Sequence, residues 1–180
     1  MDADEEVSPE LRAALLAWRE HGGDAATAGY VVARRSQYLG QWIRHGGWYP
    51  DAKLRFADRR LAHWSGFDPH DRLVAEGATG RLAGDLLHDT YASVADHLAR
   101  SESYSSIAAA ALFAAGRRAS WADILLRPPW RFVHSYVLRA GFLDGYSGFV
   151  IAAVGSMGVL AKYLKLRERG RAQAGEQSAS

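Results

Sequence analysis

The pattern of the chain changes near residue 90, and this change limits the possible folds more than any other feature. Residues 27–88 contain short apolar segments of strand type that are separated by glycines. From residue 90 to about 166, apolar side chains recur at helical spacing and alanine is frequent. Glycine favours loops and close backbone approaches, whereas alanine favours helices. The sequence therefore predicts an α/β fold with a sheet-containing domain at residues 1–90 and a helical unit at residues 91–169.

The first part is expected to begin with a helix and to continue as strands. Ser8 is a typical N-cap residue and Pro9 suits the first helical position, so a helix is predicted over residues 9–21. Strands are predicted over four segments, which are residues 29–33, 53–57, 61–64 and 82–88. The third of these is expected to pair with the second across a turn at residues 58–60.

The second part combines aromatic rings, basic residues and a long uncharged segment. A helix is predicted over residues 90–116, and a further apolar stretch over residues 121–138 is expected to break at Pro128-Pro129. The segment 145–161 has no charged residue, and its 17 residues lie at the short limit for crossing a bilayer. A membrane-seated or shallowly inserted hairpin is therefore favoured over a full span, and a buried helical hairpin is the alternative. Residues 170–180 are polar and are predicted to form a disordered tail.

The charge distribution favours a membrane surface over a nucleic acid as a partner. The net charge of +2 is too small to indicate nucleic-acid binding. From Arg117 onward there are ten basic residues and four acidic ones, and they lie among apolar and aromatic side chains. Such a segment suits an anionic membrane surface. There is no cysteine, which excludes disulfides and a thiolate nucleophile.

The acidic run Asp2-Ala3-Asp4-Glu5 is the clearest candidate for chemistry. Two carboxylates one residue apart, just before a capped helix, can share a divalent cation and the diphosphate that the cation neutralises. Asp2 and Asp4 are therefore predicted to bind Mg²⁺ or Mn²⁺. The alternative is an acidic N-terminal segment that only complements the dipole of the following helix.

Several segments, taken in order, resemble glycosyltransferase family 2, and within it the bacterial enzymes that build the lipopolysaccharide core. They are Asp2-Ala3-Asp4-Glu5, Ser8-Pro9-Glu10-Leu11, Tyr38-Leu39-Gly40, Gly47-Trp48-Tyr49-Pro50-Asp51, Lys53-Leu54-Arg55, His70-Asp71, Gly84-Asp85-Leu86-Leu87-His88, Leu126-Arg127-Pro128-Pro129-Trp130-Arg131-Phe132, Gly141-Phe142-Leu143-Asp144-Gly145 and Lys162-Tyr163. The resemblance implies a GT-A (Rossmann-like) fold that is matched only from the acidic motif onward. The nucleotide-binding half that precedes the motif in the family is missing, so the chain is expected to be a fragment that is inactive alone.

The resemblance also implies an activity. It is an inverting transfer from a nucleotide-sugar donor to a lipid-linked or lipopolysaccharide-core acceptor, at the cytoplasmic face of the bacterial inner membrane. Asp71 would be the base that takes the proton of the acceptor hydroxyl, although the family usually has the longer Glu there. The substrate-binding residues would be Trp48, Arg55, His70 and His88.

Each of these residues also has a purely structural interpretation. A loop His-Asp pair, a strand-end histidine and a capping aromatic residue are common in proteins without any ligand. Two other classes of protein therefore stay open: a noncatalytic membrane-associated module, and a soluble helical interaction domain that binds no ligand.

Overall fold

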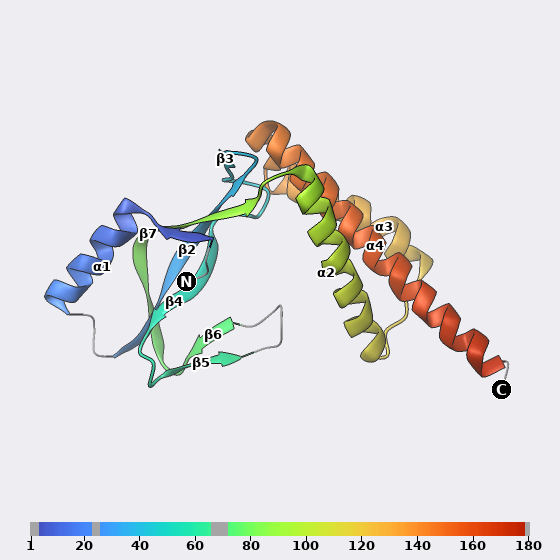
Figure 1. Ribbon diagram of the computed structural model, residues 1–180, viewed down its shortest axis with the longest axis horizontal. Coiled ribbons are helices and arrows are strands. Elements are labelled where there is room, and N and C mark those ends of the chain that lie inside the picture. Colours follow the sequence, from blue (N-terminus) through green and yellow to red (C-terminus); the bar gives the residue numbers. More distant parts are fainter. Residues whose placement is uncertain (1–3, 23–25, 66–71, 179–180) are drawn as a thin grey trace. The chain divides into compact units, whose positions relative to one another are not determined.

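The computed structural model describes residues 4–22, 26–65 and 72–178, with side chains described up to residue 173 (Figure 1). Internal contacts divide the chain into two compact units. The first contains Met1–Gln37, Trp42–Arg44 and Trp48–Thr90, and the second contains Tyr38–Gln41, His45–Gly47 and Tyr91–Ser180. The main division after Thr90 falls where the sequence pattern changes.

The first unit contains a five-stranded sheet, a separate two-stranded sheet and one helix. Its elements are β1 (Glu5–Val7), α1 (Pro9–His21), β2 (Thr27–Tyr38), β3 (Gln41–Trp42), β4 (Asp51–Ala57), β5 (Ala62–Ser65), β6 (Arg72–Ala75) and β7 (Ala78–Tyr91). Five strands form one sheet in the order β1-β7-β2-β3, and β4 pairs with β2 as well. The other two strands, β5 and β6, pair only with each other. The predicted mixture of helices and strands is confirmed; the more specific GT-A fold stays a proposal.

The predicted helix and strands are present, but one predicted pairing is wrong. Helix α1 has the bounds expected from its capping signals, and Ser8 Oγ accepts a hydrogen bond from Leu11 N at 3.2 Å. Strand β5 was expected to pair with β4, but it pairs with β6. Strand β4 is instead paired with β2, and this ladder is prolonged by a hydrogen bond from Asp58 N to Ala28 O. After β4 the chain turns at Asp58–Leu61, and Leu61 O then accepts a hydrogen bond from Glu76 N, which leads β5 into its pairing with β6.

Helix α1 packs closely on one face of the sheet. Leu11, Val32 and Leu86 are the buried centre of this contact. Ser8 joins the helix to β7, because its Oγ also accepts a hydrogen bond from Asp85 N at 3.1 Å. Gly84 has φ +90°, and a Cβ there would lie 2.6 Å from Leu11 Cα. Glycine is therefore required at this position both by the backbone conformation and by the space available.

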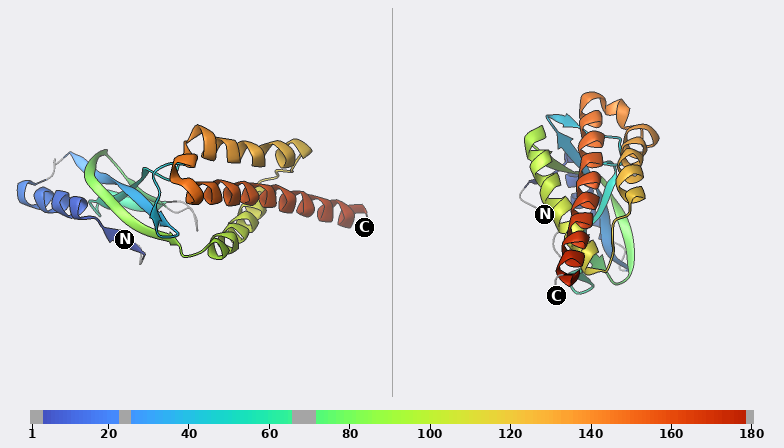
Figure 2. Two further views of the ribbon diagram at one scale, coloured as in Figure 1. Left: turned by 90° about the horizontal axis from the view of Figure 1, so that it is seen from above. Right: turned by 90° about the vertical axis from the view of Figure 1, so that its right-hand side faces the viewer.

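The second unit is helical. It contains α2 (Val94–Ala114), α3 (Trp121–Val133), a π-helical turn η1 (His134–Leu138), a 3₁₀ turn η2 (Gly141–Asp144) and α4 (Gly145–Ser178). Helix α4 packs against both α2 and α3 (Figure 2). Ala109, Ile124, Tyr163 and Leu166 lie in the buried core between these helices. The loop residue His45 belongs to this unit because its backbone N and its Nδ1 bond to the Asp144 carboxylate, at 2.8 and 3.0 Å.

The expected break at Pro128-Pro129 is wrong, because α3 continues through both prolines. Proline lacks the N–H that would bond four residues back, so it usually interrupts a helix. Here Pro128 is buried, and its carbonyl accepts a hydrogen bond from Ser156 Oγ of α4 at 2.8 Å. Packing against α4 therefore stabilises a helix that local preference disfavours. Helix α4 in turn extends to Ser178, through most of the segment predicted to be a disordered tail.

One helical segment among the described residues is long and apolar enough to cross a membrane, judged by length and composition. It is Gly141–Gln173, with a mean hydropathy of 1.5 in its most apolar window, of which 33% is buried. The same unit exposes many large apolar side chains. Those that are at least 50% exposed lie on α3, η1, η2 and α4: Trp121, Leu125, Leu126, Trp130, Val137, Leu138, Phe142, Leu143, Tyr146 and Met157.

Candidate functional site at the acidic strand end

The pairing of β1 with β7 brings Asp4 and His88 together. Glu5 lies opposite His88 in the antiparallel register, and Asp89 N donates a hydrogen bond to Asp4 O at 3.2 Å. His88 Nδ1 lies 3.5 Å from Asp4 Oδ2 and 3.4 Å from Asp4 O. The Asp4 side chain is 47% exposed, so its carboxylate remains accessible to a ligand. A carboxylate and an imidazole are thus adjacent at the N-terminal end of β1.

Glu5 occupies a different environment from its neighbour Asp4. Its side chain is fully buried (0% exposed) and is paired with two arginines, Arg55 Nη2 at 3.1 Å and Arg34 Nη1 at 3.8 Å. Arg34 also donates from Nε and Nη2 to Asp51 Oδ2, at 3.0 and 2.7 Å. Lys53 Nζ lies 3.1 Å from the other oxygen of Asp51. A buried carboxylate is tolerated when it is paired and hydrogen-bonded in this way.

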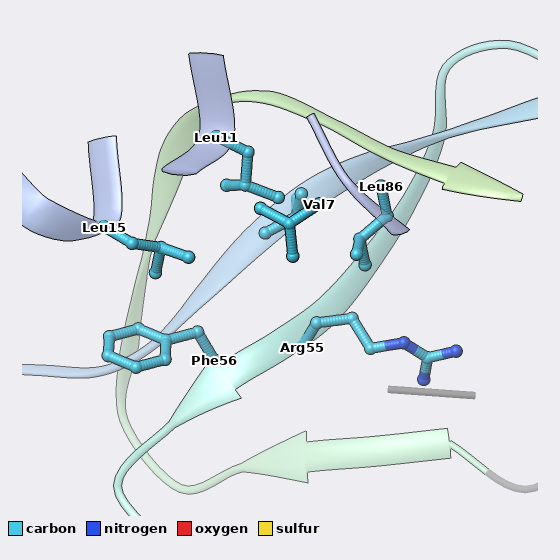
Figure 3. Close-up of a pocket in the computed structure, with 7 residues that line it drawn as sticks. Val7, Leu11, Leu15, Arg55, Phe56 and Leu86 are labelled. Carbon is cyan, nitrogen blue, oxygen red and sulfur yellow. The ribbon is translucent and has the colours of Figure 1, made fainter. Parts of the chain in front are cut away.

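A β-bulge in β4 explains how Arg55 reaches Glu5. Tyr30 lies opposite Phe56 and Val31 lies opposite Leu54, so Arg55 is an extra residue in the ladder. A bulge interrupts the alternation of side chains between the two faces of a sheet. Arg55 and Phe56 consequently line the same cavity, on the face that carries α1 (Figure 3).

This cavity is small and mainly apolar. It has a volume of about 130 Å³, and Arg55 contributes its only charged side chain (Figure 3). Its lining residues are Val7, Leu11, Leu15, Val32, Arg55, Phe56 and Leu86. The Arg55 guanidinium is already paired with Glu5, so a phosphate at this residue would have to share it with that carboxylate.

A second, larger cavity lies on the other face of β2. Its volume is about 630 Å³, and Arg35, Tyr49 and Asp85 are among its lining residues. Arg34 and Arg35 are consecutive in a strand, so they point to opposite faces. The Tyr49 hydroxyl donates a hydrogen bond to Asp85 Oδ1 at 3.1 Å. Burial raises the pKa of Tyr49, and this hydrogen bond raises it further, so the phenol stays protonated at neutral pH.

The predicted site residues are distributed unevenly over the structure. Asp4 and His88 are adjacent, and Arg55 belongs to the charge cluster around Glu5. Trp48 is half-buried in the loop between β3 and β4 and lines neither of these cavities. Three predicted residues lie outside the described part of the chain: Asp2, His70 and Asp71. Within the described ranges, no group of three or more His, Asp or Glu side chains is arranged to hold a metal ion.

Sequence reasoning did not single out Glu5, Arg34, Asp51 or the Tyr49–Asp85 pair as site residues. Glu5 had a signal, since it directly follows the Asp4 carboxylate. Arg34 had none, because one arginine in a strand-like segment does not indicate its partner. The Tyr49–Asp85 pair joins residues 36 positions apart, and no local pattern connects them.

Comparison with known proteins finds a glycosyltransferase among the proteins that the chain resembles. The chain is 25% identical over 171 residues to the lipopolysaccharide core biosynthesis glycosyltransferase LpsC of Rhizobium meliloti (strain 1021). The match covers 94% of this chain and 63% of the relative, so the chain spans less than two thirds of the relative's length. No family model matches the chain, and no solved structure matches it. The chain is therefore similar to a glycosyltransferase, which is the enzyme class suggested by its motifs.

Proposed function

We propose that this chain is part of a family 2 glycosyltransferase of the GT-A type, to which it contributes the metal motif and the acceptor side. The observation that carries the proposal is the pairing of Asp4 with His88 at the N-terminal end of β1, beside the Glu5 charge cluster. The similarity to a lipopolysaccharide core glycosyltransferase supports the same class. The reaction is an inverting transfer from a nucleotide sugar to a lipid-linked or lipopolysaccharide-core acceptor.

The residues at the strand end fit a divalent cation in part. Asp4 offers an accessible carboxylate and His88 an imidazole, and Asp2 is proposed as a further oxygen ligand. This mixed set suits Mn²⁺, while Mg²⁺ would depend mainly on the carboxylates. When bound, the cation would neutralise charge on the diphosphate leaving group. Glu5 is unavailable as a ligand, because it is buried between Arg34 and Arg55.

The roles of catalytic base and of substrate-binding residues are assigned to residues that were predicted from the sequence. Asp71 takes the proton from the acceptor hydroxyl as that oxygen bonds to the sugar, and His70 orients the carboxylate. Trp48 offers an aromatic face to a sugar or base. Arg55, held at the bulge by Glu5, would share its guanidinium with an anionic group of donor or acceptor.

Attachment to an anionic membrane is part of this proposal. Exposed aromatic and aliphatic side chains on α3, η1, η2 and α4 lie in the same unit as Arg127, Arg131 and Arg139. Rings that enter the headgroup layer while arginines meet anionic lipids would place the enzyme near a lipid-linked acceptor. We place it at the cytoplasmic face of the bacterial inner membrane, where nucleotide sugars are available.

Mn²⁺ and pyrophosphate binding test the proposal on the 180-residue chain. Calorimetric titration should show Mn²⁺ binding, and pyrophosphate binding that requires Mn²⁺. Asp4→Asn should abolish both. Asp89→Asn should leave both unchanged, because it removes a neighbouring exposed carboxylate of β7 that lies outside the proposed ligand set. If wild type binds neither ligand, or if the two variants lose binding equally, the metal motif is not a functional site.

A noncatalytic membrane-associated module is the second candidate, favoured by the same exposed apolar side chains. It predicts membrane binding without any Mn²⁺-dependent binding of pyrophosphate. The titration therefore separates the two candidates.

A further inference from the structure

A groove in the helical unit lies between α2 and α4 and has no role in the proposed transfer reaction. Its volume is about 270 Å³. Helix α2 contributes Ser101, Tyr104 and Ser105, α3 contributes Arg131, and α4 contributes Lys162. Tyr91 and His97 also line it, so the groove is bordered by two basic side chains, four hydroxyl groups and an imidazole.

Two glycines of α4 make room for this groove. A Cβ at Gly155 would lie 3.7 Å from Arg131 Nε and 3.9 Å from Nη2, so the guanidinium rests against this bare position. A Cβ at Gly158 would lie 2.6 Å from Ser101 Oγ. Larger side chains at these positions would therefore occupy the space beside Arg131 and Ser101.

The two basic side chains of the groove have no anionic partner within the described residues. Neither Arg131 nor Lys162 makes an ion pair or a side-chain hydrogen bond there. Their neighbours differ: Arg127 bonds to Asp123 and Lys165 bonds to Glu102, each at 2.6 Å. The nearby carboxylates are thus already paired, and the groove keeps an excess of positive charge.

Lys162 is partly buried beside an aromatic ring. Its Nζ lies 4.6 Å from the centre of the Tyr163 ring. Burial lowers the pKa of Lys162, and repulsion from Arg127 lowers it further, while Asp123 opposes both. An anion in the groove would stabilise the charged lysine and reverse this shift.

We propose that this groove binds a phosphoryl anion. The Arg131 guanidinium provides forked N–H donors that match phosphate oxygens, and Lys162 adds a compact positive charge. Ser101 and Tyr104 have hydroxyls with no hydrogen-bond partner among the described residues, so both can donate to phosphate oxygens. Ser105 is already occupied, since it donates to Glu102 O and accepts from Lys165. A volume just below the usual range of about 300–1,000 Å³ for drug-sized ligands suits a small headgroup.

The phosphoryl group can come from an anionic phospholipid or from a soluble phosphate. Two probes distinguish these sources: inorganic phosphate, followed by calorimetry at low ionic strength, and phosphatidylcholine vesicles with or without phosphatidylglycerol. We expect saturable binding to at least one probe. The double variant Arg131→Gln/Lys162→Gln should weaken binding by about tenfold or more, because it removes the charged donors.

Two further variants separate a built site from general attraction by positive charge. Arg169→Gln/Arg171→Gln removes the same charge from exposed positions of α4 outside the groove, and it should change binding less than twofold. Gly155→Leu keeps every charge but fills the groove, and it should weaken binding as much as the groove double variant does. Circular dichroism checks that each variant remains folded.

Each result is decisive for the groove. Phosphate binding that both groove variants lose supports a site for any phosphoryl group. Binding only to phosphatidylglycerol vesicles, with the same losses, supports a site for the lipid headgroup. The proposal is wrong if neither probe binds, if the control double variant loses as much affinity as the groove double variant, or if Gly155→Leu binds like wild type. None of these results depends on Mn²⁺ or on sugar transfer.

Discussion

At the scale of single residues, Asp4 and Glu5 are adjacent acids with opposite environments. Asp4 is half-exposed beside His88, whereas Glu5 is buried between Arg34 and Arg55. The alternation of a strand places consecutive side chains on opposite faces, which separates a carboxylate that can meet a ligand from one that holds the sheet together. Neighbouring acidic residues in one sequence motif can therefore have different roles: Asp4 can contact a ligand, and Glu5 stabilises the sheet.

Glu5→Gln should destabilise the first unit strongly. The substitution leaves Arg34 and Arg55 with an uncharged partner in a buried setting, and the expected cost is roughly 3 kcal/mol. Urea denaturation measures this loss. The matched control is Glu6→Gln, the next residue along the strand, which is exposed and should change stability by less than about 0.5 kcal/mol. Equal effects of the two substitutions would contradict a structural role for Glu5.

His97 should make the helical unit sensitive to mild acid. Its ring is buried, and Nδ1 lies 3.0 Å from the Tyr38 hydroxyl. Burial lowers the pKa of His97, with Asp96 opposing this effect. As the pH falls, His97 is therefore protonated in the unfolded chain at a higher pH than in the folded protein. The stability that neutral, buried His97 contributes is complete above about pH 6.5 and is lost as the pH falls below that value. Wild type should lose more thermal stability than His97→Gln between about pH 7.5 and pH 5.5; parallel pH profiles would show that another group titrates.

At the scale of elements, the contact between α1 and β7 depends on the positive φ and missing Cβ of Gly84. Ser8 contributes a second link, since one hydroxyl caps α1 and also bonds to β7. The start of the helix is thereby fixed to the strand that carries His88. The position of the candidate metal site therefore depends on helix packing several residues away.

Gly84→Ala should cost well over 2 kcal/mol, because alanine at φ +90° is strained and its Cβ would overlap the Leu11 backbone. Gly22→Ala is the control, since Gly22 has φ +73° and open space around a Cβ. It should cost only about 1–2 kcal/mol, from backbone strain alone. Thermal unfolding of both variants separates the two contributions. Similar losses would mean that the close approach of α1 is relieved by a small shift.

The sequence predicted elements that depend on contacts between neighbouring residues. It did not predict features that depend on contacts between residues far apart in the chain. Ser8 and Pro9 predicted the start of α1, because capping involves neighbouring residues. The continuation of α3 through Pro128 could not be read, because it depends on Ser156 and on packing against α4. The partner of β5 was missed for a similar reason, since β5 pairs with the more distant β6 and not with the adjacent β4. At the site, Asp4 and His88 were nominated separately, but their contact follows from the register of β1 and β7.

At the scale of the whole molecule, the helical unit exposes many large apolar side chains. Leu125, Leu126 and Trp130 of α3 are 63%, 66% and 61% exposed. These positions would enter the headgroup layer if the chain binds a membrane. Electrostatic attraction contributes only about 1 kcal/mol for each base near an anionic leaflet, so inserted apolar side chains should decide how firmly the chain is held.

Flotation with anionic liposomes tests this attachment. Wild type should float, and most of it should stay bound at high salt, because apolar insertion is insensitive to screening. The variant Leu125→Ser/Leu126→Ser/Trp130→Ser should be released by salt. Trp64→Ser is the control, since Trp64 is 60% exposed but belongs to the sheet unit. A wild-type chain that stays soluble at low salt would rule out membrane attachment.

The bulge at Arg55 also has an evolutionary consequence. Strand β4 keeps regular pairs on both sides of this residue, with Leu54 opposite Val31 and Phe56 opposite Tyr30. Loss of its single codon would leave every one of these pairs in place and would remove only one of the two arginines that pair with Glu5. Gain of that codon in an ancestor without it would supply the arginine just as directly. A sheet with this construction can acquire or discard a charged side chain in one mutational event, without passing through a misaligned intermediate.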